Sequence, residues 1–309
     1  MRIAVPDLVT NSYFPALAAE ELGYYAAEGL EAHVDLLTPA PRAMVALRDG
    51  SVDAVATGAH TTLTAFPQWH GAKLVVALAQ GTPWLLVLRA DIPAERGELA
   101  AVKGLYLGAA PGPDAALRRL LVDAGIDLTR DWVRIGPVPG MDAPDASFGV
   151  LAAKAMEAGQ LDGFWANALG SETAIRRGVG KILIDVRRGD GPPAARHYTF
   201  SALVTTEILI SRDPAQVAAA VRAIVRVQRA LRVDPTQARS VGIRRFPPDS
   251  AAMIATLVQQ DLPFYDPAIT EPAVDALSSF AQGLGLLTAA VPYEQVVATR
   301  FRPLWHGEP

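Results

Sequence analysis

The chain has 309 residues, 50% of them apolar and 19% charged, so it can bury more than one ordinary core and is not disordered. Its 28 basic and 32 acidic residues give a net charge of −4, which argues against nucleic acid as the main partner. It contains no cysteine, and this excludes disulfides, thiolate metal sites and cysteine nucleophiles.

The sequence predicts neither a membrane span nor a signal peptide. The most apolar stretch, residues 74–88, is interrupted by Gln80-Gly81-Thr82-Pro83 and is shorter than the roughly 18 residues that a span needs. The first residues enter a strand pattern directly. We therefore expect either a cytoplasmic protein or a periplasmic or cell-surface protein whose leader has been removed.

Strand and helix patterns alternate along the first part of the chain. Residues 3–5 predict a strand, and apolar residues at helical spacing predict a helix from Phe14 towards Gly23, with Asn11 or Ser12 as its N-cap. Strands are predicted at residues 32–37 and 52–56, with a helix between them that Pro41 opens and Gly50 ends. Such alternation predicts a parallel α/β sheet.

The same order recurs in the second part of the chain. Strands are predicted at 104–108 and 132–135 and helices at 114–124 and 150–158. Residues 46–54 match residues 155–163 at an offset of 109, which makes Asp162 the counterpart of Asp53. In each copy a helix ends at a glycine, and an acidic residue opens the next strand. The repeat predicts two domains of similar architecture.

Two extended apolar segments, residues 84–91 and 200–206, predict the crossings between these domains. The second domain would then be inserted into the first, with lobe I formed by residues 1–89 and 201–309 and lobe II by residues 90–200. Two crossings predict a hinge. From Pro214 onward the pattern is helical, and we expect these helices to pack on lobe I.

The local sequence resembles one family. Gly23-Tyr24-Tyr25 followed by Glu28-Gly29-Leu30 is similar to the "GYF-x-x-EGL" segment of the NMT1/THI5-like family, and Val52-Asp53, Thr57-Gly58 and Leu161-Asp162-Gly163 resemble its next motifs. The resemblance implies a two-lobed α/β fold of the type II periplasmic binding proteins, with two hinge strands and a helical C-terminal tail. It also implies a substrate-binding protein of an ABC transporter, of the nitrate, sulfonate, taurine or thiamine-pyrimidine type.

The family also contains enzymes. Its pyrimidine synthases carry a cysteine-rich iron-binding motif, and its desulfinases use a cysteine nucleophile. Because this chain lacks cysteine, neither chemistry carries over.

In such a fold we expect ligands at the carboxyl ends of the strands. In lobe I, Asn11 and Ser12 either cap a helix or contact the ligand, and Tyr13 is placed to stack on a planar ligand. Thr57, Gly58 and His60 follow the next strand; for His60 a structural role and a place in the site both stay open. Two further candidates are Gln80 and Trp84, the latter as a stacking wall or as a residue between the lobes.

In lobe II, Gly112 allows a close approach of the backbone to a ligand, and Asp114 is predicted as a helix N-cap, with ligand contact as the alternative. Trp165 and Asn167 follow the strand that Asp162 opens, and we expect both at the ligand. A slip of one residue would exchange Trp165 with Phe164. Asp142 and Asp145 are predicted to form turns.

The leading hypothesis is a binding protein that captures a small planar or aromatic ligand between its lobes. We expect no metal and no cofactor, a monomer, and an ABC transporter permease as partner if the chain is exported. One alternative is a cytoplasmic enzyme with His60 as general acid or base, assisted by Asn167 or Asp7. A second alternative is an intracellular ligand sensor.

Overall fold

The computed structural model describes residues 1–306 except 9, 141–147 and 247. The predicted turn formers Asp142 and Asp145 lie outside the described residues. The chain divides into two compact units. Unit 1 comprises Met1–Gly81 and Thr199–Pro309, and unit 2 comprises Thr82–Tyr198.

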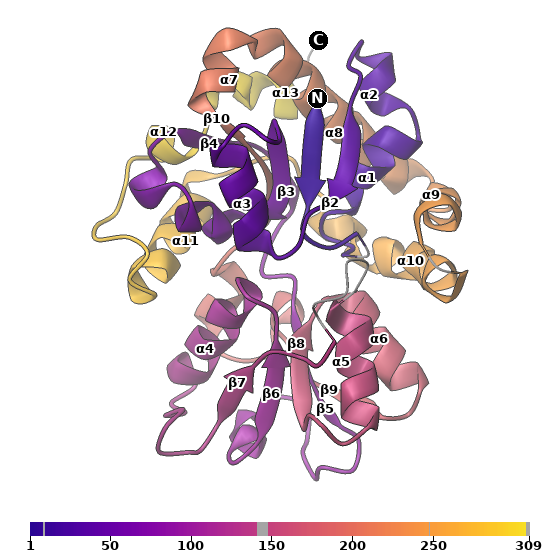
Figure 1. Ribbon diagram of the computed structural model, residues 1–309, viewed down its shortest axis with the longest axis vertical. Coiled ribbons are helices and arrows are strands. Elements are labelled where there is room, and N and C mark those ends of the chain that lie inside the picture. The colour runs from indigo at the N-terminus through magenta and orange to yellow at the C-terminus, as the bar shows by residue number, and fades with distance from the viewer. Residues whose placement is uncertain (9, 141–147, 247, 307–309) are drawn as a thin grey trace. The chain divides into compact units, whose positions relative to one another are not determined.

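Unit 1 is built on a mixed sheet, sheet A, whose strands β1 (Arg2–Val5), β2 (His33–Leu36), β3 (Ala54–Gly58), β4 (Ala72–Ala79) and β10 (Ser201–Thr206) have the order β2-β1-β3-β10-β4 (Figure 1). β1 is parallel to β2 and β3, whereas β10 is antiparallel to β3 and β4. The carboxyl ends of β1 to β4 and the amino end of β10 therefore share one edge, the carboxyl edge of sheet A.

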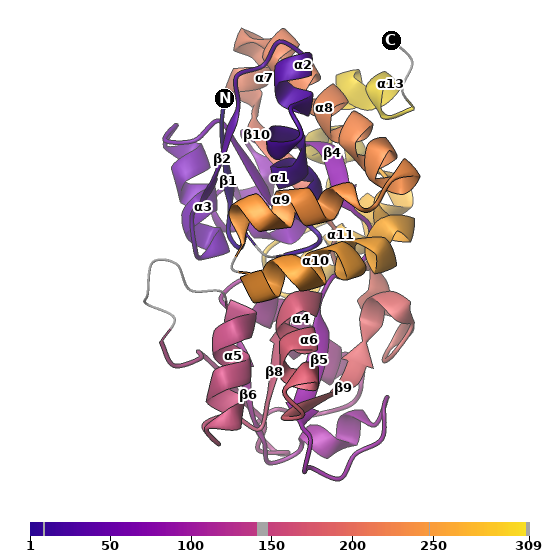
Figure 2. The same ribbon diagram turned by 90° about the vertical axis from the view of Figure 1, so that its right-hand side faces the viewer.

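The helices of unit 1 pack either on sheet A or on one another. They are α1 (Phe14–Glu21), α2 (Tyr24–Ala27), α3 (Ala40–Arg48), α7 (Glu207–Arg212), α8 (Pro214–Val233), α9 (Gln237–Arg245), α10 (Pro248–Asp261), α11 (Glu271–Gly283), α12 (Tyr293–Val296) and α13 (Arg302–Trp305). The long helix α8 packs on α1, α2 and β4, and α9 and α10 lie side by side (Figure 2). The C-terminal helices thus pack on unit 1, as predicted.

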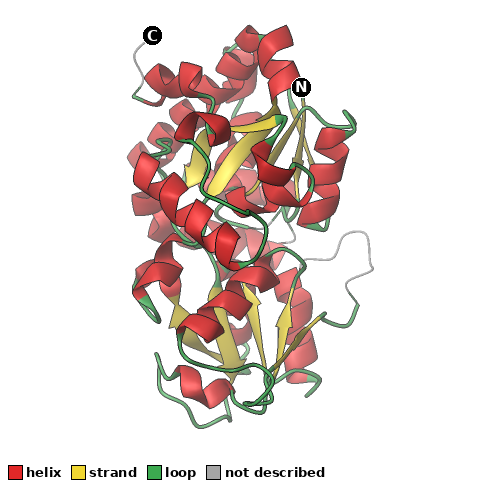
Figure 3. Ribbon diagram, turned by 90° about the vertical axis from the view of Figure 1, so that its left-hand side faces the viewer, coloured by secondary structure: helices red, strands yellow, loops and turns green. Residues whose placement is uncertain are grey.

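Unit 2 repeats this plan. Its sheet B contains β5 (Leu85–Arg89), β6 (Tyr106–Ala109), β7 (Arg134–Gly136), β8 (Gly163–Ala166) and β9 (Gly180–Asp185) in the order β7-β6-β8-β5-β9. The sheet is flanked by α4 (Pro113–Asp123), α5 (Phe148–Glu157) and α6 (Ala168–Arg176) (Figure 3). β6 is parallel to β7 and β8, and β5 is antiparallel to β8 and β9. The predicted α/β fold with two lobes and a helical C-terminal region is confirmed.

The boundaries of the units differ from the predicted ones at the first crossing. The predicted lobe I extended to residue 89, but β5 belongs to unit 2, because it hydrogen-bonds to β8 and β9 of sheet B. The chain passes from one unit to the other at Gly81–Thr82 and at Tyr198–Thr199. The strand that follows each crossing, β5 or β10, is antiparallel to both of its neighbours.

The predicted equivalence of Asp53 and Asp162 is visible in their hydrogen bonds. The Asp53 carboxylate accepts the N–H of Arg2 at 2.7 Å, and the Asp162 carboxylate accepts the N–H of Tyr106 at 2.9 Å. Each backbone N–H of these aspartates in turn donates to the carbonyl of the same partner. The repeated aspartate thus satisfies the first backbone N–H of the neighbouring strand, β1 or β6, in both units.

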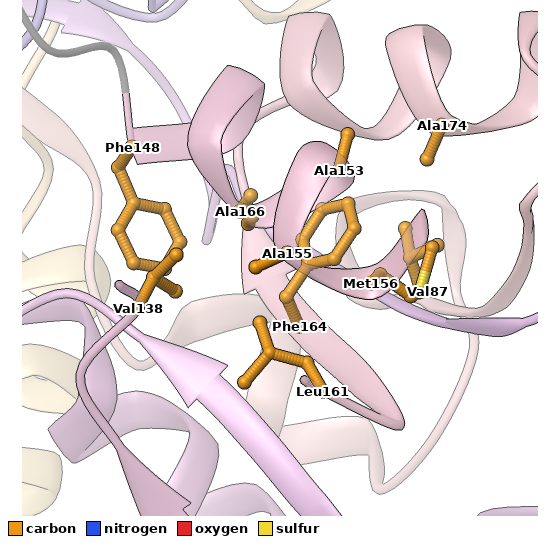
Figure 4. Packing of buried hydrophobic residues seen from close by; sticks show 11 residues of the cluster. Val87, Val138, Phe148, Ala153, Ala155, Met156, Leu161, Phe164, Ala166 and Ala174 are labelled. Carbon is orange, nitrogen blue, oxygen red and sulfur yellow. The ribbon is translucent and has the colours of Figure 1, made fainter. Parts of the chain in front are cut away.

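One hydrophobic core cluster of unit 2 lies between sheet B and helices α5 and α6. Phe164 of β8 is fully buried in a cluster with Leu161, Met156 and Val87 (Figure 4). α5 and α6 meet at Gly149 and Gly170, where a Cβ on Gly170 would lie 2.4 Å from the Gly149 Cα. Only glycine therefore allows the two helices to pack this closely.

Within the described part of the chain, none of the helices combines the length and the apolarity that a bilayer crossing requires.

Candidate functional site

The loop from β1 to α1 contributes Tyr13 to the carboxyl edge of sheet A. Tyr13 is the residue before α1, and its side chain is 4% exposed. Burial and the nearby charge of Asp7 raise the pKa of its phenol above the ordinary value, while the Thr57 hydroxyl and the Gly58 backbone act in the opposite direction. Tyr13 is therefore a neutral hydrogen-bonding group beside the end of β3.

The N-cap prediction for Asn11 and Ser12 is wrong, because α1 begins at Phe14 as predicted and neither residue directly precedes it. Tyr13 occupies the N-cap position, and no side chain caps this helix end. Asn11 Nδ2 instead donates to the carboxylate of Asp261. Asn11 Oδ1 is buried and has no partner among the described residues. Ser12 is fully buried in the same loop.

The loop after β3 places His60 at the same edge. It lies in a short 3₁₀ helix, η1 (Ala59–Thr64). His60 Nδ1 lies 3.1 Å from Thr199 Oγ1, and the imidazole meets the Phe280 ring edge-on at 5.6 Å. His60 is 2% exposed. Thr199 and Phe280 both lie in unit 1 and hold the ring in a fixed orientation.

Two residues at this edge come from β10 and β4. Ser201 opens β10 opposite Gly58, and its buried hydroxyl has no partner among the described residues. Gln80 follows β4, and its Nε2 donates to the carbonyls of Asp266 and Ala268 at 2.9 and 2.7 Å. Both amide hydrogens of Gln80 therefore hold the C-terminal segment of unit 1 in place.

In unit 2, Trp84 and Trp165 form an aromatic pair with ring centroids 6.1 Å apart and planes tilted by 46°. Trp165 lies within β8, one position from its end, and not in the loop that follows it. The Trp165 indole N–H is buried without an acceptor among the described residues. The pair lies at the carboxyl edge of sheet B, because Leu85 at the start of β5 pairs with Ala166 at the end of β8.

The other predicted residues of unit 2 take structural positions at this edge. Asn167 caps α6, its Oδ1 accepting the N–H of Gly170 at 3.0 Å. Gly112, with φ of 99°, is the N-cap of α4, and the Asp114 carboxylate accepts its N–H at 3.0 Å. Asp114 is therefore not the N-cap that was predicted, because Pro113 already begins the helix.

The sequence patterns missed four residues of the carboxyl edge of sheet A, namely Thr199, Ser201, Asp261 and Tyr265. Tyr265 donates its hydroxyl to the Asn11 carbonyl at 2.6 Å, and Asp261 ends α10. These two lie some 250 positions from Asn11 in the chain, and no local pattern predicts such a contact. Ser201 could have been predicted from one feature of the sequence: it is the first residue of an apolar strand, and the first residue of this strand lies at the carboxyl edge of sheet A.

Among the described residues, no group of three or more His, Asp or Glu side chains is placed to hold a metal ion.

A family model described as the NMT1-like family matches residues 8–243. The chain belongs to the NMT1-like family. The matched region includes the loops after β1, β3, β6 and β8, so it contains most of the candidate residues. No curated protein matches the sequence.

Three solved structures show how widely this fold is shared by proteins of low sequence identity. The ligand-binding component of an ABC-type import system from Staphylococcus aureus has a TM-score of 0.75 and 14% identity, covering 100% of this chain and 98% of that one. A putative periplasmic sulfonate-binding protein, SsuA, from Methylobacillus flagellatus KT has a TM-score of 0.67 and 19% identity. The match covers 97% of this chain and 92% of that one. A mutant of DSZB in complex with biphenyl-2-sulfinic acid has a TM-score of 0.66 and 17% identity. The match covers 98% of this chain and 97% of that one.

Proposed function

We propose that this NMT1-like protein is a solute-binding protein that captures a small organic ligand and delivers it to an ABC importer. Membership of the family supports the proposal. The likeness to an ABC-type ligand-binding component and to a sulfonate-binding protein supports it further.

The observation that carries the proposal is a pair of buried polar atoms at the carboxyl edge of sheet A. Asn11 Oδ1 and Ser201 Oγ have no partner among the described residues, and both residues are at most 1% exposed. A buried polar atom without a partner costs about 1–3 kcal/mol. A ligand group that forms a hydrogen bond with either atom removes the cost at that atom, so each atom is suited to binding.

We further propose that the ligand is planar or aromatic. Tyr13 at the carboxyl edge of sheet A and the pair Trp84–Trp165 at that of sheet B are the aromatic residues that support this. Offset or edge-to-face contacts with such rings contribute about 0.5–1.5 kcal/mol each beyond the area that they bury.

The proposal includes a location and a partner. A binding protein of an importer works outside the cytoplasmic membrane, so we propose a periplasmic or cell-surface location and an ABC permease as partner. We propose that the protein acts as a monomer, since each molecule has both lobes that a hinge closure needs.

A thermal-stability screen against aromatic acids, sulfonates and pyrimidines tests this function. A ligand that binds only the folded state stabilises it by RT ln(1 + [L]/Kd), which is about 2.7 kcal/mol at a hundredfold excess over Kd. We expect at least one class to raise Tm in the wild type, and to raise it less in Ser201→Ala. An unchanged Tm across all three classes would contradict a solute-binding role.

The second candidate function is an enzyme on the same fold, with His60 as general acid or base. Two observations favour it, the burial of His60 at the carboxyl edge of sheet A and the likeness to DSZB, described as a desulfurization enzyme. This chain has no cysteine, so an enzyme here would have to work without a thiolate nucleophile.

A further inference from the structure

The side-chain amide of Asn11 is held in one orientation. Its Nδ2 donates to the carboxylate of Asp261, the last residue of α10. A carboxylate oxygen only accepts hydrogen bonds, so the nitrogen arm of the amide has to face Asp261 and the oxygen arm has to face away from it. Both residues are 1% exposed, and water therefore does not compete for this bond.

The backbone of Asn11 is held as well. Tyr265, itself completely buried, donates its hydroxyl to the Asn11 carbonyl oxygen at 2.6 Å. Because backbone and side chain are both fixed by residues of the C-terminal helices, the position of Oδ1 is fixed too. Oδ1 is an acceptor only, and it has no donor among the described residues.

Two other polar groups at the carboxyl edge of sheet A, the hydroxyls of Ser201 and Tyr13, have an adaptable hydrogen-bonding geometry. The Ser201 hydroxyl donates or accepts by rotation, and so does the phenol of Tyr13, which its raised pKa keeps neutral. These hydroxyls can bind a ligand that donates a hydrogen bond as well as a ligand that accepts one. Asn11 Oδ1 can only accept a hydrogen bond. This atom therefore determines whether a ligand with a donor group or a ligand with only acceptor groups is preferred.

We propose that the ligand presents a hydrogen-bond donor, an N–H or O–H group, to Asn11 Oδ1, and that this contact selects amine, amide and hydroxyl head groups over acceptor-only anions such as sulfonate and nitrate. The inference rests on the proposed function and adds the chemical class of the ligand. A site built around a fixed acceptor rejects ligands without the matching donor, because it leaves the acceptor buried and unpaired.

The test uses aromatic probes that differ only in their head groups. Benzylamine, benzamide and benzyl alcohol carry a donor, and benzenesulfonate does not; each is titrated against the full chain by calorimetry. We expect at least one donor probe to bind at least tenfold more tightly than benzenesulfonate. Tighter binding of benzenesulfonate would overturn the inference and leave the solute-binding function intact, whereas binding of no probe would contradict both.

Two variants connect the selectivity to Asn11. Asn11→Leu should weaken the best donor probe about tenfold and leave benzenesulfonate unchanged. Asp261→Asn offers both a donor and an acceptor to Asn11, so the Asn11 amide can turn over, and we expect the preference for donor probes to fall about tenfold. Asp261 acts here as a positioning residue.

The matched control is Gln295→Met, which removes an amide of unit 1 that donates to the Gln68 carbonyl instead. Its preference among the probes should equal that of the wild type. If Asn11→Leu does not fold, the preference of Asp261→Asn among the probes tests the inference by itself. A role of Asp261 in stability only would weaken every probe equally, and that result would overturn the inference.

Discussion

Phe164 and Trp165 are neighbours in β8, and their side chains lie on opposite faces of sheet B because side chains alternate along a strand. Phe164 is a member of the core cluster under α5 and α6 (Figure 4). Trp165 packs against Trp84 on the other face. Phe164 is thus a core residue of unit 2, and the role of Trp165 as a ligand wall stays a prediction.

We predict that Phe164→Ala and Trp165→Ala have different effects. Phe164→Ala removes a core side chain and should lower the free energy of unfolding by about 3–5 kcal/mol. If Trp165 is a ligand wall, Trp165→Ala should weaken binding tenfold to a hundredfold, about 1–3 kcal/mol, with a smaller loss of stability. Urea denaturation and a calorimetric titration of both variants check this. Equal losses of stability with unchanged affinity would place Trp165 in the core.

A second residue-scale prediction concerns the contact between α5 and α6. A Cβ on Gly170 would lie 2.4 Å from the Gly149 Cα, so the helices have to move apart. We expect Gly170→Ala to lower the free energy of unfolding by about 1–3 kcal/mol in urea denaturation. The control is Arg176→Ala, at an exposed position of the same helix, which should stay within about 0.5 kcal/mol of the wild type. Equal values for the two variants would contradict this account of the packing.

At the scale of elements, ion pairs connect the first helices of unit 1 to its C-terminal helices. The carboxylate of Glu28, which follows α2, accepts hydrogen bonds from Arg222 and Arg226 of α8 at 2.5 and 2.7 Å. Burial alone would raise the pKa of Glu28, but the two guanidinium groups lower it below its ordinary value of 4.5. The ion pairs formed by Glu28 are therefore a pH-dependent part of the stability of unit 1.

We predict the sign of this dependence from the lowered pKa. The unfolded chain takes up a proton at Glu28 more readily than the folded one, so the contribution is complete above about pH 4.5 and is lost as the pH falls through the folded-state pKa. Glu28→Gln should cost about 1–3 kcal/mol at pH 7 and less at pH 3, measured by urea denaturation. The control Glu31→Gln changes a side chain that is 91% exposed and should cost little at either pH. A pH-independent cost would contradict the assignment.

The helices and strands could be predicted from the sequence better than the side-chain contacts between distant segments. Strand and helix patterns, and glycines such as Gly23 with φ of 76°, depend on nearby residues, and most elements lie where the periodicity placed them. Asn11 does not cap α1, and the orientation of its amide depends on Asp261, which is 250 residues away. The repeat of Asp53 and Asp162 was predictable, because both units use the same local hydrogen bonds.

At the scale of the whole molecule, two units with the same strand order are joined by two chain crossings. Each sheet gathers polar and aromatic residues at its carboxyl edge, which is where ligands bind in open α/β sheets. The sequence predicted this plan because the duplication leaves a repeat in the chain. It could not predict which head group the edge of sheet A prefers, since that preference depends on contacts between distant segments.

A solute-binding protein releases its ligand chemically unchanged, whereas an enzyme converts it. Calorimetric titration with the best ligand of the stability screen, followed by mass spectrometry of the released compound, tests this most directly. We predict a stoichiometry of one ligand per chain, recovery of the compound unchanged after prolonged incubation, and the same recovery with His60→Ala. Conversion of the compound by the wild type that is lost in His60→Ala would contradict the account and make the protein an enzyme.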